Sequence, residues 1–124
     1  MYTKQEGSPR AQNQPLWQVL DKLVPTAQDY VVIKHHAGSF LETELHTLLQ
    51  DNEIDTLVMC RVQTEYCVDT TVKSAYSHGY KVKLVRDCHS TYNSDVLTAE
   101  QIINHHNNIL NQFTTIVNSC EIDF

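Results

Sequence analysis

The sequence predicts an α/β fold with a mostly parallel sheet, and two patterns support that prediction. Short apolar runs rich in β-branched residues recur along the chain, and stretches with apolar side chains at helical spacing lie between them. Strands that alternate with amphipathic helices form right-handed βαβ units, whose strands are parallel. The chain has 124 residues, of which 41% are hydrophobic. This is enough for one small core, so we expect a single domain.

The N-terminal part of the chain is polar before the predicted elements begin. Residues 1–15 contain one glycine and two prolines, and we expect an extended arm there. The predicted folded domain then covers residues 16–124. It opens with a short helix or a packed segment over residues 16–23, followed by a β-branched strand over residues 29–34 that ends at Lys34.

The rest of the chain alternates between predicted helices and strands. Thr98 and Gln101 form a capping-box pattern at the start of the last helix, because a good N-cap is followed three residues later by a glutamine. The expected helices cover residues 42–52, the segment after Thr64, and residues 98–110. The expected strands cover residues 56–60, 81–86 and 114–117.

Cys67 is the first candidate for chemistry because it lies between a strand and a helix. The apolar run 54–60 predicts a buried strand, and helical spacing begins at Val68. A thiol at a helix start faces unpaired backbone N–H groups and the positive end of the helix dipole, which favour the thiolate. Ligands of α/β sheets bind at the same kind of position. A structural core cysteine is the alternative, since free cysteine is among the most buried residue types.

Lys34 and Asp87 follow two other predicted strands. If these strand ends share one edge of the sheet with Cys67, the Lys34 ammonium would lower the pKa of the thiol. A solvated lysine at a strand exit is the alternative interpretation. Asp87 would be a third polar group at this edge, or else a turn or capping residue before His89.

The composition argues against several classes of partner. Lys and Arg total 9 against 15 acidic residues, a net charge of −6 with no basic cluster, so we expect no nucleic-acid or anionic-membrane surface. No apolar stretch is long enough to span a membrane. The four cysteines form no C-x-x-C pair and no apolar leader precedes them, which indicates reduced thiols in a cytoplasmic protein.

The sequence also lacks the usual metal and cofactor motifs. His35 and His36 are neighbours at a strand exit, so their side chains point to opposite faces. His105 and His106 are about 100° apart on a helix, unlike the i, i+4 pair of a metal site. There is no glycine-rich phosphate loop. We therefore expect no metal and no cofactor.

Several segments together resemble one family of enzymes, the isochorismatase-like cysteine hydrolases. The likeness covers roughly residues 15–118. The matching segments are Val31-Val-Ile-Lys34, Ser39-Phe40, Thr43-Glu-Leu45, Val62-Gln-Thr-Glu-Tyr-Cys-Val-Asp-Thr-Thr71, Ala75, Gly79-Tyr80, Val85-Arg-Asp87 and His89-Ser-Thr91, followed by the helix over 98–110.

The resemblance implies a three-layer α/β/α fold and an amide-hydrolysing site with an Asp–Lys–Cys triad. Carried over by position, Cys67 would be the nucleophile and Lys34 its charged partner. The family's non-proline cis peptide would fall between Val62 and Gln63. The backbone N–H groups of Gln63 and Cys67 would then form the oxyanion hole. Members of the family act on small molecules and are mostly oligomers.

Two departures from the family pattern qualify this expectation. The first strands of the family's sheet, one of which carries the catalytic Asp, have no counterpart in the sequence, so the domain is expected to be N-terminally truncated. Arg61 stands where relatives commonly carry glycine, and it would either block the pocket or lower the pKa of Cys67. Glu65 and Asp69 are close to Cys67 in the sequence, but they point elsewhere on the helix turn. We therefore do not expect either carboxylate to replace the missing Asp.

Three functions therefore remain open at this point. The first is a hydrolase that acts on a small amide, or a related C–N or ether substrate, through Cys67. The second is a truncated, non-catalytic homologue that works as a homo-oligomer, with exchanged strands as one form, or as a partner subunit. The third, a small flavodoxin-like binding module, rests on architecture alone.

Overall fold

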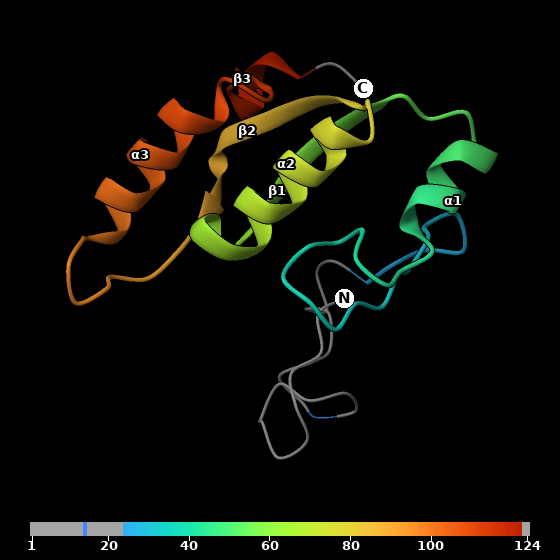
Figure 1. Cartoon of the computed structure of the whole chain (residues 1–124), viewed down its shortest axis with the longest axis horizontal. Coiled ribbons are helices and arrows are strands. Elements are labelled where there is room, and N and C mark those ends of the chain that lie inside the picture. Colours follow the sequence, from blue (N-terminus) through green and yellow to red (C-terminus); the bar gives the residue numbers. More distant parts are fainter. Residues whose placement is uncertain (1–13, 15–23, 123–124) are drawn as a thin grey trace.

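A computed structural model describes residue 14 and residues 24–122 (Figure 1). It contains a three-stranded parallel sheet in the order β1-β2-β3, which confirms the α/β fold with a parallel sheet. The strands are β1 (Thr56–Val62), β2 (Lys81–Ser90) and β3 (Thr115–Val117). The helices are α1 (Leu45–Asp51), α2 (Asp69–Ser77) and α3 (Ala99–Leu110), with a π-helical turn η3 (Thr64–Val68) and a 3-10 turn η4 (Ser119–Glu121). The expected helix over 16–23 lies outside the described residues, as does the expected arm apart from residue 14.

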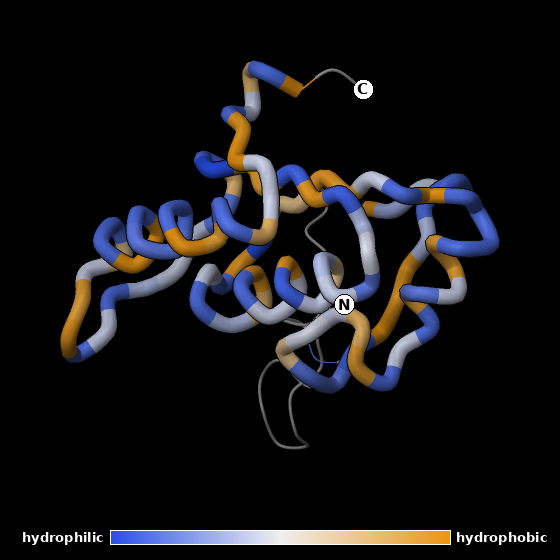
Figure 2. Tube along the Cα trace, turned by 45° about the horizontal axis from the view of Figure 1, so that its top comes forward, coloured by the Kyte–Doolittle hydropathy of each residue, from blue (hydrophilic) through white to orange (hydrophobic). Residues whose placement is uncertain are grey.

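The helices pack on one face of the sheet. Each step from β1 to β2 to β3 moves in the same direction, so two right-handed crossovers place α2 and α3 on the same side. Alternate strand residues face them, among them Met59 of β1 and the fully buried Leu84 of β2. Leu49 of α1 belongs to the same core. Figure 1 shows α2 in front of β1, and in Figure 2 hydrophilic and hydrophobic stretches alternate along α3.

The capping box predicted at the start of the last helix is present. The Thr98 side chain accepts from the Gln101 N–H at 3.2 Å, and the Gln101 side chain accepts from the Thr98 N–H at 2.9 Å. In the connection from β1 to β2, Gly79 follows the C-terminal end of α2 and has a φ of +87°. Glycine adopts this left-handed conformation at little cost, which allows the helix to end there.

The strand predicted over residues 29–34 does not form; Lys34 alone makes an isolated bridge. Side chains of Tyr30 and Val31 are 64% and 48% exposed. A β-branched run gains its stability from packing against neighbouring strands and from a buried face. Tyr30, Val31 and Ile33 are all exposed, so this segment lacks the continuous buried face that stabilises a strand.

The other strands and helices form close to their predicted places, and α1, β1 and β2 differ most in length, with β1 running to Val62 rather than residue 60. Helix α1 starts at Leu45 rather than residue 42, and Glu42 has a positive φ of 52°. Strand β2 runs to Ser90 rather than residue 86. Met59 pairs with Leu84 but Arg61 pairs with His89, so β2 carries extra residues opposite β1. This bulge brings the end of β2 beside the end of β1.

Candidate active site

Cys67 lies in a π-helical turn rather than in the first turn of an α-helix. Strand β1 ends at Val62, and the peptide bond from Val62 to Gln63 is cis. The carbonyl oxygen of Gln63 accepts from the N–H groups of Tyr66 (3.3 Å) and Val68 (3.1 Å), which flank Cys67. The thiol is buried, with 7% exposure. Single π-turns are rare and occur often at functional sites, which marks this turn as unusual local structure.

The structure brings Lys34 to Cys67. The lysine side chain is 2% exposed, and its Nζ donates to the carbonyl oxygens of His36 (2.9 Å) and Ala37. Burial and the positive charge of Arg61 lower the pKa of Lys34 to about 8, while the charge of Cys67 and a hydrogen bond to its side chain act in the opposite direction. Lys34 is therefore a buried amine in contact with the thiol, not a solvated surface lysine.

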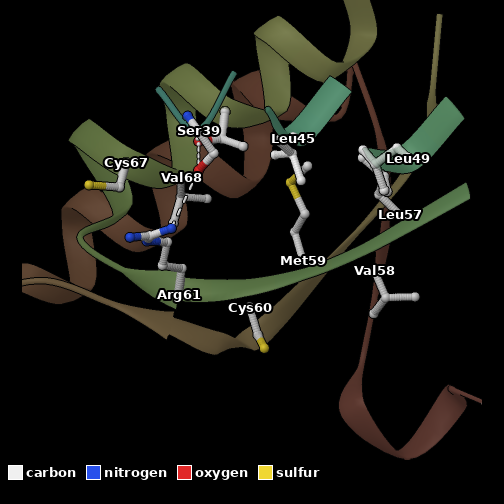
Figure 3. A pocket seen from close by; sticks show the side chains of 11 residues that line it. Ser39, Leu45, Leu49, Leu57, Val58, Met59, Cys60, Arg61, Cys67 and Val68 are labelled. Carbon is white, nitrogen blue, oxygen red and sulfur yellow. Dashed lines mark hydrogen bonds between the residues drawn. The ribbon is translucent and has the colours of Figure 1, made fainter. Parts of the chain in front are cut away.

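A cavity of about 240 Å³ lies next to Cys67 (Figure 3). Cys67 and Arg61 lie at one end of it, and Leu49 and Leu57 lie at the other. The walls between them are mostly apolar. The residues that line the cavity are Ser39, Leu45, Leu49, Leu57, Val58, Met59, Cys60, Arg61, Cys67, Val68 and Thr71.

Arg61 extends along the floor of this cavity toward the Cys67 end. Its Nη1 donates weakly to the Ser39 hydroxyl, at 3.4 Å. Ser39 is itself tied to α2, since its N–H donates to Thr71 Oγ1 and its hydroxyl accepts from the same side chain, both at 3.2 Å. Arg61 thus places a positive charge beside both Cys67 and Lys34.

The carboxylates near Cys67 in sequence are engaged elsewhere. Glu65 accepts from the Thr91 hydroxyl at 2.8 Å, and Asp69 forms an ion pair with Lys73 at 2.7 Å. Asp87 does not join the site. It accepts from the N–H (2.9 Å) and hydroxyl (2.6 Å) of Ser119, and these bonds lower its pKa. It holds the first residue of η4 rather than a turn before His89, so neither of the roles considered from the sequence describes it.

The described part of the chain contains no group of three or more His, Cys, Asp or Glu side chains that could hold a metal ion. His36 pairs with Glu42 at 3.0 Å, and the rings of His105 and His106 lie 5.5 Å apart in an edge-on arrangement. Among the helices of the described residues, none is long and apolar enough to cross a membrane.

Sequence reasoning missed a buried polar network directly behind the Cys67 turn. It consists of Thr64, His89 and Asn107, which are 0%, 5% and 8% exposed. One signal could have revealed it: Asn107 lies on the apolar face of α3, three residues before Leu110. A polar side chain at a core position of an amphipathic helix calls for a buried partner.

The family model of the isochorismatase domain matches residues 2–116. The chain belongs to the isochorismatase family. The structure of the chain is similar to a solved isochorismatase family protein, with a TM-score of 0.86 and 35% sequence identity. The match covers 94% of this chain and 70% of the solved one. The streptothricin hydrolase of Streptomyces noursei is 34% identical over 69% of this chain, and the maleamate amidohydrolase of Pseudomonas putida is 31% identical over 65%.

This isochorismatase-family chain spans only part of its curated relatives. The aligned part covers 34% of the streptothricin hydrolase and 38% of the maleamate amidohydrolase. The match to the family model begins at residue 2, so it includes the residues for which the sequence predicts an arm.

Proposed function

We propose that this isochorismatase-family protein hydrolyses a small amide, or a related C–N or ether substrate, with Cys67 as nucleophile. The observation that carries the proposal is the contact of a buried lysine with a buried thiol at the end of a cavity. Two relatives with hydrolase names, one of them an amidohydrolase, support an amide-type reaction. The alignment covers well under half the length of those two relatives, so the activity and the substrate of this chain are proposed here and are not taken from them.

Lys34 can move a proton to and from the thiol without changing its other bonds. A neutral amine has two N–H groups and one lone pair. The two N–H groups can bond to the carbonyls of His36 and Ala37, while the lone pair accepts the proton of Cys67. After transfer, the ammonium faces the thiolate and stabilises it. A pKa of about 8 gives Lys34 access to both of its protonation states near neutral pH, as proton transfer requires.

In the proposed reaction the thiolate attacks the carbonyl carbon and a C–S bond forms. The N–H groups of Gln63 and Cys67, both in the turn that follows β1, would donate to the oxyanion. Collapse breaks the C–N bond, and the leaving nitrogen takes the proton that Lys34 holds. Water then attacks the thioester, which releases the acid and restores the thiol.

The experiment compares Cys67→Ala with Cys120→Ala on a panel of small primary amides. Cys120 is an exposed free thiol in η4, away from the cavity, so it is a matched control. We expect loss of Cys67 to lower kcat/KM by about a thousandfold or more, and loss of Cys120 to leave it unchanged. Undiminished turnover in Cys67→Ala would remove the proposal.

A non-catalytic homologue is the second candidate, and Arg61 is the observation that favours it. The guanidinium extends into the cavity beside the nucleophile and could occupy the space of a substrate. The two candidates differ in thiol reactivity. Iodoacetamide should alkylate Cys67 faster than a model thiol at pH 7 if the site is catalytic. Labelling no faster than the model thiol would favour the non-catalytic function.

We also propose that the protein is a cytoplasmic homo-oligomer. A nucleophilic thiolate persists where thiols stay reduced, and all four cysteines are free. Strand β1 is an outer strand of the described sheet and has two exposed apolar residues, Val58 and Val62, which supports assembly along this edge.

A further inference from the structure

Three buried side chains form a chain of hydrogen bonds behind the Cys67 turn. Thr64 Oγ1 lies 2.9 Å from His89 Nδ1, and His89 Nε2 lies 3.0 Å from Asn107 Oδ1. Asn107 Nδ2 donates to the carbonyl oxygen of Arg86 at 3.4 Å. The network thus connects η3 to the end of β2 and to α3. None of its members touches the cavity that contains Cys67.

The outer end of the network determines the direction of every bond in it. A backbone carbonyl only accepts, so the Asn107 amide must direct its NH₂ toward Arg86 and its oxygen toward His89. His89 Nε2 must then carry a proton in order to donate to that oxygen. In a neutral ring this leaves Nδ1 as an acceptor, so the Thr64 hydroxyl donates to it.

We propose that His89, as the neutral Nε2–H tautomer, is a positioning residue that holds the π-turn of the nucleophile in place through Thr64. Thr64 is the first residue of η3 and is completely buried. The inference rests on the proposed function, because it assigns His89 a role in placing Cys67 against Lys34.

A second bond, from the residue that directly follows β2, supports this role. The Thr91 hydroxyl donates to Glu65 Oε1 at 2.8 Å, so two successive residues of η3 are bonded to the segment at the end of β2. The bulge that extends β2 is what brings His89 opposite Arg61 and within reach of η3. A π-turn is rare and has little stability of its own, so bonds from neighbouring elements decide whether it keeps its shape.

The test uses Thr64→Val, which keeps the side-chain shape and removes the hydroxyl, and Thr64→Ser, which keeps the hydroxyl. Thr114→Val is the matched control, because Thr114 is also buried and its hydroxyl donates to the Val82 carbonyl at 2.6 Å. It lies next to β3, outside the cavity lining. The rate of Cys67 alkylation by iodoacetamide, followed by peptide mass spectrometry, reports the placement of the thiol directly.

We expect Thr64→Val to slow Cys67 alkylation about tenfold, and Thr64→Ser to restore most of the rate, because a small displacement of a reactive group has a large effect on rate. Thr114→Val should leave the rate unchanged even if it lowers the melting temperature equally. Equal effects of Thr64→Val and Thr114→Val, or none from Thr64→Val, would overturn the proposal.

A measurement on the unaltered chain covers the case in which Thr64→Val fails to fold. The ¹⁵N chemical shifts of His89 should show a protonated Nε2 and an unprotonated Nδ1, and the opposite tautomer would contradict the proposed bond directions. Failure of the proposed hydrolase function is distinguishable from either result. It would appear as unchanged turnover in Cys67→Ala, whereas the alkylation rates and ¹⁵N shifts need no substrate.

Discussion

Lys34 is an amine held at the boundary between its two protonation states. Burial and the positive charge of Arg61 disfavour the ammonium, while the charge of Cys67 and a hydrogen bond to its side chain favour it. The result is a pKa of about 8, well below the value of 10.5 for a free lysine. The same balance that lets Lys34 exchange a proton with Cys67 makes its charge a cost to folding at neutral pH.

This cost gives a stability change with a defined sign. Because the folded pKa is lower than the unfolded one, the unfolded chain binds more protons between about pH 8 and 10.5, and stability rises with pH across that window. The comparison is Cys67→Ala against Cys67→Ala with Lys34→Met, which avoids titration of the thiol. Between about pH 8 and 10.5, the free energy of unfolding of the single variant should rise by up to about 3 kcal/mol relative to that of the double variant. A tenfold change in proton affinity corresponds to about 1.4 kcal/mol.

Urea denaturation of both variants at pH 7 to 10.5 measures this difference. Without the thiol, the contributions that raise the pKa of Lys34 are gone, so the gain should begin at or below pH 8. A difference that stays constant over the whole range would show that Lys34 titrates alike in the folded and unfolded states, and a difference that shrinks would reverse the sign of the pKa change.

At the residue level, the sequence singled out the thiol and the amine that the structure brings together, but not what surrounds them. Cys67 and Lys34 follow from their places at strand ends, where α/β folds collect polar groups. The same reasoning put Asp87 at this edge, and there it failed, because the bulge in β2 turns Asp87 toward Ser119. His89 was missed because its role depends on Asn107, which lies far from it in the sequence and close to it only in the fold.

Among the elements, α3 is the one whose boundary the sequence determined best. Its N-terminus depends on a local contact, the reciprocal bonds of Thr98 and Gln101, which sequence spacing alone reveals. The limits of β2 and the form of η3 depend on pairing with β1, which no local pattern encodes. The run over 29–34 has strand composition but no strand, since three of its apolar residues are exposed and β propensity depends on a half-buried surface.

The capping box allows a prediction for the stability of α3. Thr98→Ala removes the acceptor for the Gln101 N–H and should lower the free energy of unfolding by about 1 kcal/mol. Thr47→Ala is the control, an exposed threonine in the interior of α1, where alanine has the higher helix propensity. Chemical denaturation of both variants gives the comparison. Equal stability of Thr98→Ala and the unaltered chain would mean that the cap contributes nothing to folding.

At the level of the whole molecule, the helices of residues 24–122 cover one face of the sheet and leave the other face uncovered. All three α-helices contribute to or contact a core on one face, to which Leu57 and Met59 of β1 point. Val58 points to the other face and is 41% exposed, and Val62 is 50% exposed. An outer strand with free backbone groups and apolar side chains pairs readily with another chain. Burial of this strand between copies would cover surface that a monomer leaves in water.

The proposed assembly predicts that a charge on β1 separates the copies. Lysine on an outer strand opposes pairing, so Val58→Lys should convert the oligomer to a monomer in size-exclusion chromatography with light scattering. Val96→Lys is the control, because Val96 is 86% exposed in the loop before α3 and lies away from β1. It should leave the mass unchanged. An unaltered chain that runs as a monomer, or an oligomer that survives Val58→Lys, would place the interface elsewhere or rule it out.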